Sequence, residues 1–253
     1  MAHEETVRMV PGAKTAVLFM HGIAGTPDHF RVLLPLEALI PPEWSVYNVL
    51  MDGHGKQVED FSHSSMKKWK AQVVGIFDEL CRIHEQVIVV GHSMGTLFAV
   101  QMALRRPEKV PFIFLIACPL RVGVKMGGAV NLIRMSFGRL NLNDPVQAAI
   151  SKVSSITQTW MSWKYIGWLP RLVELLREMR YTETLLPKLS VPCIAYQSKE
   201  DELVSCRSCQ ILRHSGRAEV HGLRNSTHFY YTDKDITDIQ QRFQKAMETA
   251  GSL

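Results

Sequence analysis

The chain has 253 residues, of which 46% are hydrophobic, so it is long enough to bury the core of one large α/β domain. Its formal net charge of +5 is mild, and the basic residues do not cluster with exposed aromatic side chains, which argues against a nucleic-acid partner. The longest apolar stretch, around residues 110–120, is too short to span a bilayer, and residues 1–12 lack the apolar core of a secretory signal. Five cysteines cannot all pair, which fits a reducing compartment. We therefore expect a cytoplasmic protein without stable membrane insertion.

Short apolar runs alternate along the chain with segments of helical periodicity. Strands are predicted at residues 15–20, 87–90, 112–116, 192–197 and 218–221. Helices are predicted at residues 66–84, 96–104 and 170–180, and from about Asp235 onward. Ser64 and Ser65 offer an N-cap for the first of these helices. This alternation predicts an α/β fold with a mostly parallel sheet and helices on both of its faces.

The strand at 87–90 runs directly into Gly91-His92-Ser93-Met94-Gly95, and a helical pattern follows. A serine between two glycines at a strand-to-helix corner is typical of a nucleophile elbow. The glycines are needed because the turn is too tight for Cβ atoms around a residue in strained backbone geometry. Such a turn presents the serine hydroxyl at the edge of the sheet. Ser93 is therefore the predicted nucleophile.

A second glycine-bearing loop, His21-Gly22-Ile23-Ala24-Gly25, follows the first predicted strand. The tetrahedral intermediate of acyl transfer carries a negative oxygen that needs two preorganised hydrogen-bond donors. The backbone N–H groups of Met94, next to the nucleophile, and of Ile23, in this loop, are the expected pair. Gly22 and Gly25 let the loop approach the substrate closely. His21 is expected to brace the loop through its ring nitrogens rather than to act as the base.

A serine hydroxyl needs a histidine to take its proton and a carboxylate to fix the tautomer of that histidine. For this kind of elbow the order along the chain is serine, then acid, then histidine. The turn after the fourth predicted strand contains Asp201, and the loop past the last strand contains His228, so these two are the predicted acid and base. His221 is the alternative base, but it falls at a strand end, where a packed or surface histidine is commoner. Glu200 and Glu202 are expected to be solvated turn charges.

About seventy residues separate the strand ending at Cys118 from the one beginning near Val191, far more than a simple α/β connection. We predict a core, residues 1–118 and 188–253, and an inserted helical cap, residues 119–187. Asp144 and Pro145 form a predicted helix start within the cap.

The predicted cap is rich in large apolar side chains: Trp160, Trp163, Trp168, Met126, Met135, Met161 and Met179. Most of them should fix the cap to the core, and a minority should line a pocket that suits an alkyl or aryl acyl group. In the helix at 170–180, one side is predicted to consist of Leu172, Leu175, Leu176 and Met179.

The combined motifs resemble those of the α/β-hydrolase superfamily: His21-Gly22-x-x-Gly25, Asp52-Gly53-His54-Gly55, Gly91-His92-Ser93-Met94-Gly95, Asp201 and Ser226-x-His228. The resemblance extends over about residues 14–248, and the chain is similar to compact bacterial carboxylesterases and monoacylglycerol lipases. It implies that Ile23 and Met94 are the oxyanion-hole donors. It also implies that the loop containing His54 shapes the pocket rim without a catalytic role. Epoxide hydrolases and haloalkane dehalogenases place an aspartate where Ser93 stands, which argues against both activities.

These inferences predict a serine hydrolase that cleaves carboxylic esters with an apolar acyl or aryl group through an acyl-enzyme on Ser93. The expected partner is a small-molecule ester, and the mechanism needs neither a metal nor an organic cofactor. Thioester, peroxide and carbon–carbon bond chemistry can use the same triad, and a ligand-binding receptor with the hydrolase fold is a further alternative. Cys206 and Cys209 have CxxC spacing, but only His214 lies nearby as a third ligand, so zinc is not expected. The oligomeric state is not predicted.

Overall fold

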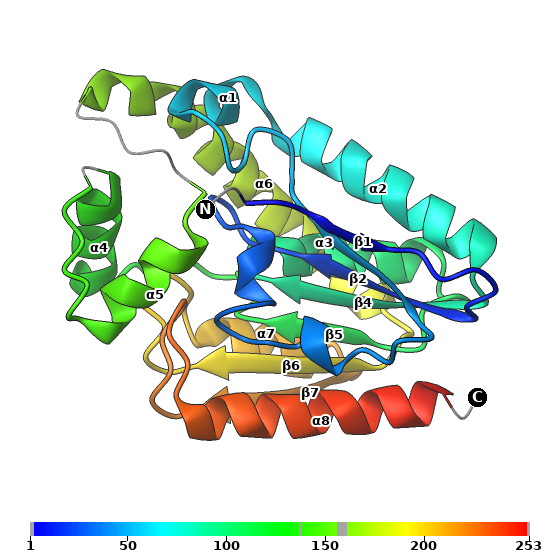
Figure 1. Ribbon diagram of the computed structural model, residues 1–253. Coiled ribbons are helices and arrows are strands. Elements are labelled where there is room, and N and C mark those ends of the chain that lie inside the picture. The colour runs from blue at the N-terminus through cyan, green and yellow to red at the C-terminus, as the bar shows by residue number, and fades with distance from the viewer. Residues whose placement is uncertain (1–2, 137, 156–160, 252–253) are drawn as a thin grey trace.

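The computed structural model of this chain describes residues 3–136, 138–155 and 161–251. Its centre is a seven-stranded sheet with the strand order β1-β3-β2-β4-β5-β6-β7 (Figure 1). The strands are β1 (Thr6–Arg8), β2 (Thr15–Met20), β3 (Ser45–Val49), β4 (Gln86–His92), β5 (Ile113–Ile116), β6 (Cys193–Ser198) and β7 (Ala218–Leu223). Neighbouring strands pair in parallel, apart from β1, which runs antiparallel to β3. The predicted α/β fold with a mostly parallel sheet is confirmed.

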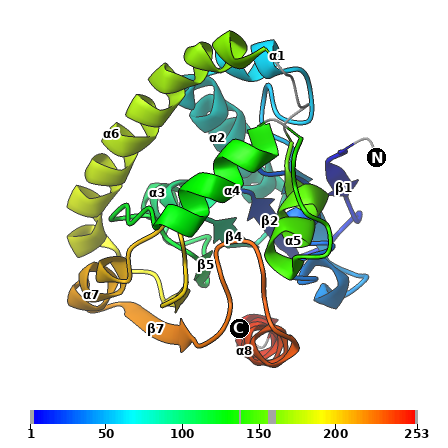
Figure 2. The same cartoon turned by 90° about the vertical axis from the view of Figure 1, so that its left-hand side faces the viewer.

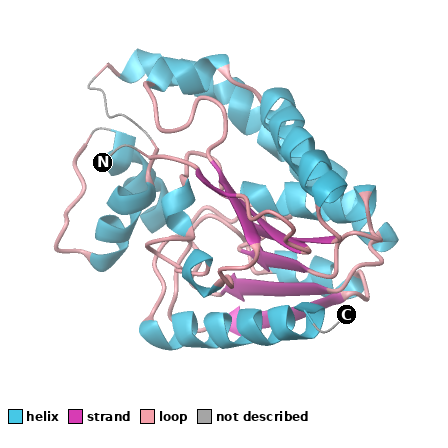
Figure 3. Cartoon of the chain, turned by 45° about the vertical axis from the view of Figure 1, so that its right-hand side comes forward, coloured by secondary structure: helices cyan, strands magenta, loops and turns pink. Residues whose placement is uncertain are grey.

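Helices cover both faces of the sheet, as predicted (Figure 3). The α-helices are α1 (Val58–His63), α2 (Met66–Ile83), α3 (Met94–Arg105), α4 (Met126–Ser136), α5 (Pro145–Val153), α6 (Leu169–Leu185), α7 (Arg207–His214) and α8 (Asp233–Gly251). Short 3-10 helices are η1 (Pro27–His29), η2 (Glu37–Leu39), η3 (Ser162–Trp168) and η4 (Leu186–Lys188). The side chain of Ser65 accepts a hydrogen bond from the Lys68 N–H, so one of the two predicted serines does cap α2.

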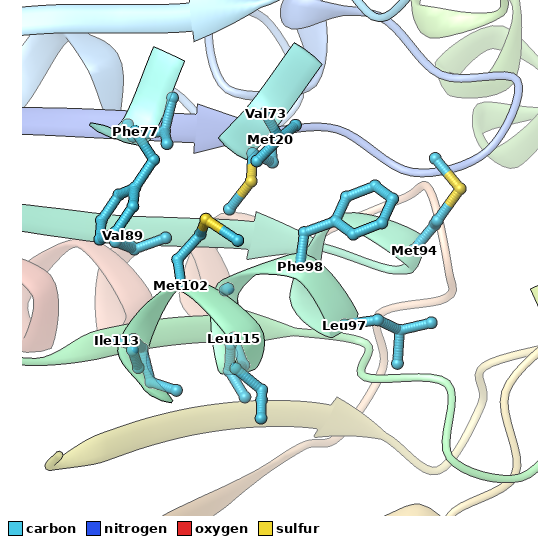
Figure 4. Packing of buried hydrophobic residues seen from close by; sticks show 14 of the residues in the cluster. Met20, Val73, Phe77, Val89, Met94, Leu97, Phe98, Met102, Ile113 and Leu115 are labelled. Carbon is cyan, nitrogen blue, oxygen red and sulfur yellow. The ribbon is translucent and has the colours of Figure 1, made fainter. Parts of the chain in front are cut away.

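The core has two layers because successive residues of a strand point to opposite faces of the sheet. Leu18 and Met20 of β2 pack with α2 and α3, whereas Val17 and Phe19 pack with α8 on the other side. Figure 4 shows side chains of α2, α3 and the strands that meet in the first layer. Every residue of β2 is buried, so its apolar run is continuous rather than alternating.

Between β5 and β6 the chain forms α4, α5, η3 and α6, within the predicted cap. Figures 1 and 2 show α4 and α5 beyond the carboxyl ends of the strands. The Asp144 carboxylate accepts hydrogen bonds from the N–H groups of Val146 and Gln147, so the predicted start of α5 at Pro145 is confirmed. Trp160 and the side chain of Met135 lie outside the described residues. The division of the chain into core and cap stays a prediction.

The predicted apolar side of the helix at 170–180 needs correction. Leu175, Met179 and Thr182 of α6 face the core, and Met179 is buried. Leu172 and Leu176 are instead 46% and 45% exposed. The helical period predicts the helix, but the packing of α6 along α3 decides which of its side chains the core covers.

Candidate active site

Ser93 occupies the turn between β4 and α3 with a backbone φ of 49°, a region that is strained for a residue other than glycine. Hydrogen bonds hold this conformation. The Ser93 N–H donates to the carbonyl of Ile116 (2.9 Å), and the N–H and hydroxyl of Thr96 both donate to the Ser93 carbonyl (2.9 and 2.6 Å). This is the local geometry expected of a nucleophile elbow.

The two glycines of the elbow allow a contact that no side chain would permit. A Cβ at Gly95 would lie 2.1 Å from the carbonyl oxygen of Met20 at the end of β2, and a Cβ at Gly91 would lie 2.6 Å from the carbonyl carbon of Gly95. The first turn of α3 therefore packs directly against the backbone of the central strands. Met94, as the first residue of α3, has an N–H group without a carbonyl partner in the preceding turn of its own helix.

The loop after β2 lies directly beside Ser93. A Cβ at Gly22 would come 2.9 Å from the Cβ and 3.4 Å from the Oγ of Ser93. His21 braces this loop, as the sequence predicts: its Nε2 accepts the N–H of Met51 (3.1 Å), so its Nδ1 carries the proton that is donated to the Gly22 carbonyl (2.8 Å). Burial lowers the pKa of His21 to about 4, so the ring is neutral at pH 7.

His54 braces the next residue of the same loop. Its Nε2 accepts the N–H of Ala24 (3.2 Å), which has a positive φ of 55°, and the Ala24 carbonyl accepts the N–H of Ser155 from the segment after α5 (3.1 Å). These bonds fix the backbone on the far side of half-buried Ile23, the predicted oxyanion donor. His54 thus contacts the loop as a structural residue would, and its lack of a catalytic role stays a prediction.

The predicted acid and base form a buried hydrogen bond: the Nδ1 of His228 donates to the Oδ2 of Asp201 at 2.9 Å, and both residues are 2% exposed. The Oδ1 of Asp201 accepts the N–H groups of Leu203 (2.9 Å) and Val204 (2.8 Å), and Oδ2 also accepts from Gln197 (3.1 Å). Burial alone would raise the pKa of Asp201, but the positive charge of His228 and the hydrogen bonds from His228, Val204 and Leu203 lower it. Asp201 is therefore ionised at neutral pH.

His228 lies against the Ser93 elbow. Its ring centroid is 4.8 Å from that of His92, the residue before Ser93, and the His92 Nε2 lies 3.2 Å from the carbonyl oxygen of His228. Burial alone would lower the pKa of His228, but the charges of Asp201 and Glu202 and the Asp201 hydrogen bond raise it above the usual 6.5. His221, the alternative base, lies in β7 beside the ring of Tyr196.

Residues 17–237, most of the chain, match the model of the alpha/beta hydrolase family. This chain belongs to that family.

Similar proteins include lipolytic enzymes. The chain is 27% identical over 233 residues to the thermostable monoacylglycerol lipase of Bacillus sp. strain H-257, covering 89% of this chain and 87% of that one. A solved structure from work on LipS and LipT, two metagenome-derived lipolytic enzymes, superposes with a TM-score of 0.72 and 20% identity, covering 98% of each chain. The meta-cleavage product hydrolase CumD of Pseudomonas fluorescens IP01 superposes with a TM-score of 0.64 and 18% identity, covering 97% of this chain and 94% of that one. At these identities the two structures show that the fold is shared.

The structure of this hydrolase corrects the prediction for Glu202. Glu200 is exposed, as expected of a turn charge, and its carboxylate lies 3.5 Å from the Lys125 ammonium. Glu202 is only 8% exposed, and its Oε2 accepts the backbone N–H of His228 at 2.9 Å. The carboxylate turns inward because that N–H lies beside it, a contact between segments 26 residues apart that the local sequence does not reveal.

Three further residues of the site were not predicted. The buried rings of His29 and His92 stack with centroids 3.6 Å apart, and the Tyr231 hydroxyl lies 3.2 Å from the Nε2 of His29. Burial lowers the pKa values of His29 and His92 well below 6.5, so both rings are neutral at pH 7. His92 precedes Ser93 in the chain, so its presence in the site could have been predicted. Nothing in the sequence links His29 or Tyr231 to the elbow.

Other candidate features lie away from Ser93. A hollow of about 800 Å³ opens between the N-terminal segment and the loop after β3, lined in part by Glu4, Asp52 and Lys68, but not by Ser93 or His228.

Among the described residues, no group of three histidine, cysteine or carboxylate side chains is placed to hold a metal ion. Within the same residues, no helix is long and apolar enough to cross a membrane.

Proposed function

We propose that this hydrolase is a serine esterase that cleaves carboxylic esters with an apolar acyl or aryl group through an acyl-enzyme on Ser93. The main support is the buried hydrogen bond between Asp201 and His228 beside the strained turn of Ser93. The loop of Gly22, which follows the neighbouring strand β2, approaches the same serine. These contacts support a site in which Ser93 is the nucleophile, His228 the oriented base and the N–H groups of Ile23 and Met94 the oxyanion donors, which is the constellation that acyl transfer requires.

In the first half of the reaction, the Ser93 oxygen attacks the ester carbonyl carbon while His228 accepts the hydroxyl proton. The carbonyl π-bond opens, and the negative oxygen receives hydrogen bonds from the N–H groups of Ile23 and Met94. Asp201 holds the proton on Nδ1 of His228, so that Nε2 is free to act as the base. The protonated His228 then gives its proton to the leaving alcohol, and the carbonyl reforms as the Ser93 ester.

In the second half, water replaces the alcohol and the same groups act again. His228 removes a proton from water, the hydroxide oxygen attacks the acyl carbon, and the oxyanion returns to the two N–H groups. Collapse of this intermediate breaks the bond to the Ser93 oxygen, which takes the proton back from His228. The carboxylic acid is released and the enzyme is restored.

The apolar acyl group is supported by two observations. The relative from Bacillus is named a monoacylglycerol lipase. In this chain the segment that covers the carboxyl ends of the strands includes α4, on which Met126 and Val130 are 85% and 39% exposed. We accordingly include monoacylglycerols among the proposed substrates. Trp168 of η3 packs on Phe61 of α1 (centroids 4.5 Å apart), a contact that joins this segment to the rest of the fold.

The proposal is tested by hydrolysis of p-nitrophenyl acetate, butyrate, octanoate and palmitate and of a monoacylglycerol, with fluorophosphonate labelling and peptide mapping alongside. We expect turnover, label on Ser93, and a loss of roughly 10⁴–10⁶ in kcat for Ser93→Ala. The matched control is Ser151→Ala, at an exposed serine of α5. A Ser93→Ala variant that keeps a tenth of the wild-type activity would contradict the assignment.

The alternatives give different results in the same assay. Labelling of Ser93 without ester turnover would favour thioester, peroxide or carbon–carbon bond chemistry. The absence of both labelling and turnover in a folded protein would favour a ligand-binding receptor.

A further inference from the structure

The loop that carries Asp201 also presents a second carboxylate to the base. Asp201 contacts the imidazole of His228, and the next residue, Glu202, accepts the backbone N–H of the same histidine at 2.9 Å. Two consecutive acidic residues therefore contact one histidine, the first at its ring and the second at its backbone N–H. Mechanisms of this reaction class require only the first of these contacts.

The burial of Glu202 is unusual for a residue with a structural role alone. The residue is 8% exposed, and its Oε1 has no hydrogen-bond partner among the residues that the structure describes. Burying a carboxylate costs free energy unless a positive charge or a full set of donors offsets it. The imidazolium of His228 that forms during catalysis is a positive charge beside this carboxylate.

The segment between β5 and β6 also packs against Glu202. Its carbonyl accepts the N–H of Lys125 at 2.8 Å, and a Cβ at Gly128 of α4 would lie 2.7 Å from that carbonyl oxygen and 2.8 Å from the Cγ of Glu202. Only glycine fits at position 128. The close packing of α4 therefore fixes the direction in which the Glu202 side chain extends.

We propose that Glu202 is a positioning residue for His228: it anchors the backbone of the base and places a second negative charge beside the imidazolium. This inference rests on the proposed function of His228 as the base. The loop then has two roles toward His228. Asp201 sets the tautomer of the ring, and Glu202 stabilises the ring when it is protonated.

The other groups around His228 do not supply that charge. Among the residues that the structure describes, the ionisable groups that face it from the packed elements are Asp201, Glu202, His92, His29 and Tyr231. Burial keeps His29 and His92 neutral, and it raises the pKa of Tyr231 well above 10, so this hydroxyl stays protonated. The two neighbouring carboxylates are the negative charges that raise the pKa of His228.

Two substitutions separate the charge of Glu202 from its hydrogen bond. Glu202→Gln removes the charge but keeps an oxygen that can accept the His228 N–H. Glu202→Asp keeps the charge but withdraws the carboxylate by one methylene. Glu200→Gln, which removes an exposed charge two positions away, is the matched control.

The experiment measures the pKa of the His228 ring by NMR titration, with the signal assigned through His228→Gln, and the pH profile of kcat/KM with p-nitrophenyl butyrate. Thermal unfolding checks that each variant folds. For Glu202→Gln we expect the pKa of His228, and the acid limb of the profile, to fall by about one unit. For Glu202→Asp we expect the pKa to stay near that of the wild type and kcat to fall about tenfold, with KM unchanged, because a buried N–H loses its acceptor.

An unchanged pKa of His228 in Glu202→Gln would overturn the proposal. An equal shift in Glu200→Gln would do so too, because the effect would then be one of general surface charge. The NMR titration needs no substrate, so its result stands even if the wild type hydrolyses no ester. A wild type that hydrolyses no ester would contradict the proposed function, but it would leave the measured link between Glu202 and His228 intact.

Discussion

The Cα of Gly22 lies against the side chain of Ser93, so closely that a Cβ on Gly22 would come 2.9 Å from the Cβ of Ser93 and 3.2 Å from the Nδ1 of His92. The two residues belong to loops after different strands, β2 and β4, which are neighbours in the sheet. Parallel neighbours end at the same edge, so the strand pairing itself brings the predicted oxyanion loop to the predicted nucleophile.

Gly22→Ala should therefore damage activity more than stability. The added methyl group pushes the loop away from Ser93 and moves the Ile23 N–H out of line with the oxyanion. We expect kcat to fall roughly 10²-fold, as when one oxyanion donor is lost, with ester hydrolysis as the measurement. Gly75→Ala is the matched control: it lies on the exposed side of α2 with nothing within 4 Å of an added Cβ. This control should stabilise the fold by about 0.5–1 kcal/mol and leave kcat unchanged.

Asp201→Asn should inactivate the enzyme through the tautomer of His228. The Oδ1 of Asp201 is fixed by the N–H groups of Leu203 and Val204, so the single amide oxygen of asparagine should stay there. The amide NH₂ then faces Nδ1 of His228 and forces the proton onto Nε2, where the base must be free. We expect kcat to fall about 10⁴-fold with the fold intact. Asp78→Asn, at a surface ion pair with Arg105, should keep full activity, and equal losses in the two variants would argue against this mechanism.

Sequence reasoning was strongest where residue type and local backbone determine each other. The continuous apolar run of β4 and the glycines around Ser93 predict a strand, a strained turn and a helix, and all three are present. It was weakest where tertiary contacts decide. Strand β1 has three residues at the edge of the sheet, too few for a period. The burial of Glu202 depends on contacts with His228 and Gly128, which are distant in sequence.

The pH dependence of activity should follow His228. The base acts in its neutral form, and its pKa is raised above 6.5 by the neighbouring carboxylates, which outweigh the opposite effect of burial. As the pH falls through this raised pKa, the ring gains a proton and kcat/KM should decline tenfold per pH unit. At pH values above the pKa, the rate should be constant. Stopped-flow or plate assays from pH 5 to 9 test this expectation, and a profile that is flat from pH 5 to 8 would show that another base operates or that chemistry is not rate-limiting.

The stability of the fold should fall in acid because four histidines are buried in neutral form. The pKa of His21 is about 4, and burial lowers the pKa values of His29, His54 and His92 well below 6.5. In the unfolded chain these rings take up protons once the pH falls below 6.5, whereas the folded protein resists protonation. The free energy of unfolding should therefore decrease as the pH falls from 6.5 toward 4. His21 alone would contribute a loss of about 2 kcal/mol between pH 7 and pH 5.

Urea unfolding at pH 7 and pH 5 measures this loss, and His54→Gln isolates one part of it. Glutamine can still accept the Ala24 N–H but does not titrate, so the variant should lose less stability between the two pH values than the wild type does. His214→Gln, at an exposed histidine of α7, should leave the pH dependence as it is. The raised pKa of His228 acts in the opposite sense, because its contribution is full below pH 6.5 and disappears as the pH rises through its folded value. If His54→Gln showed the same loss as the wild type, burial of neutral His54 would not contribute to acid unfolding, and the carboxylates that are ionised in the fold, Asp201 among them, would be the groups to test next.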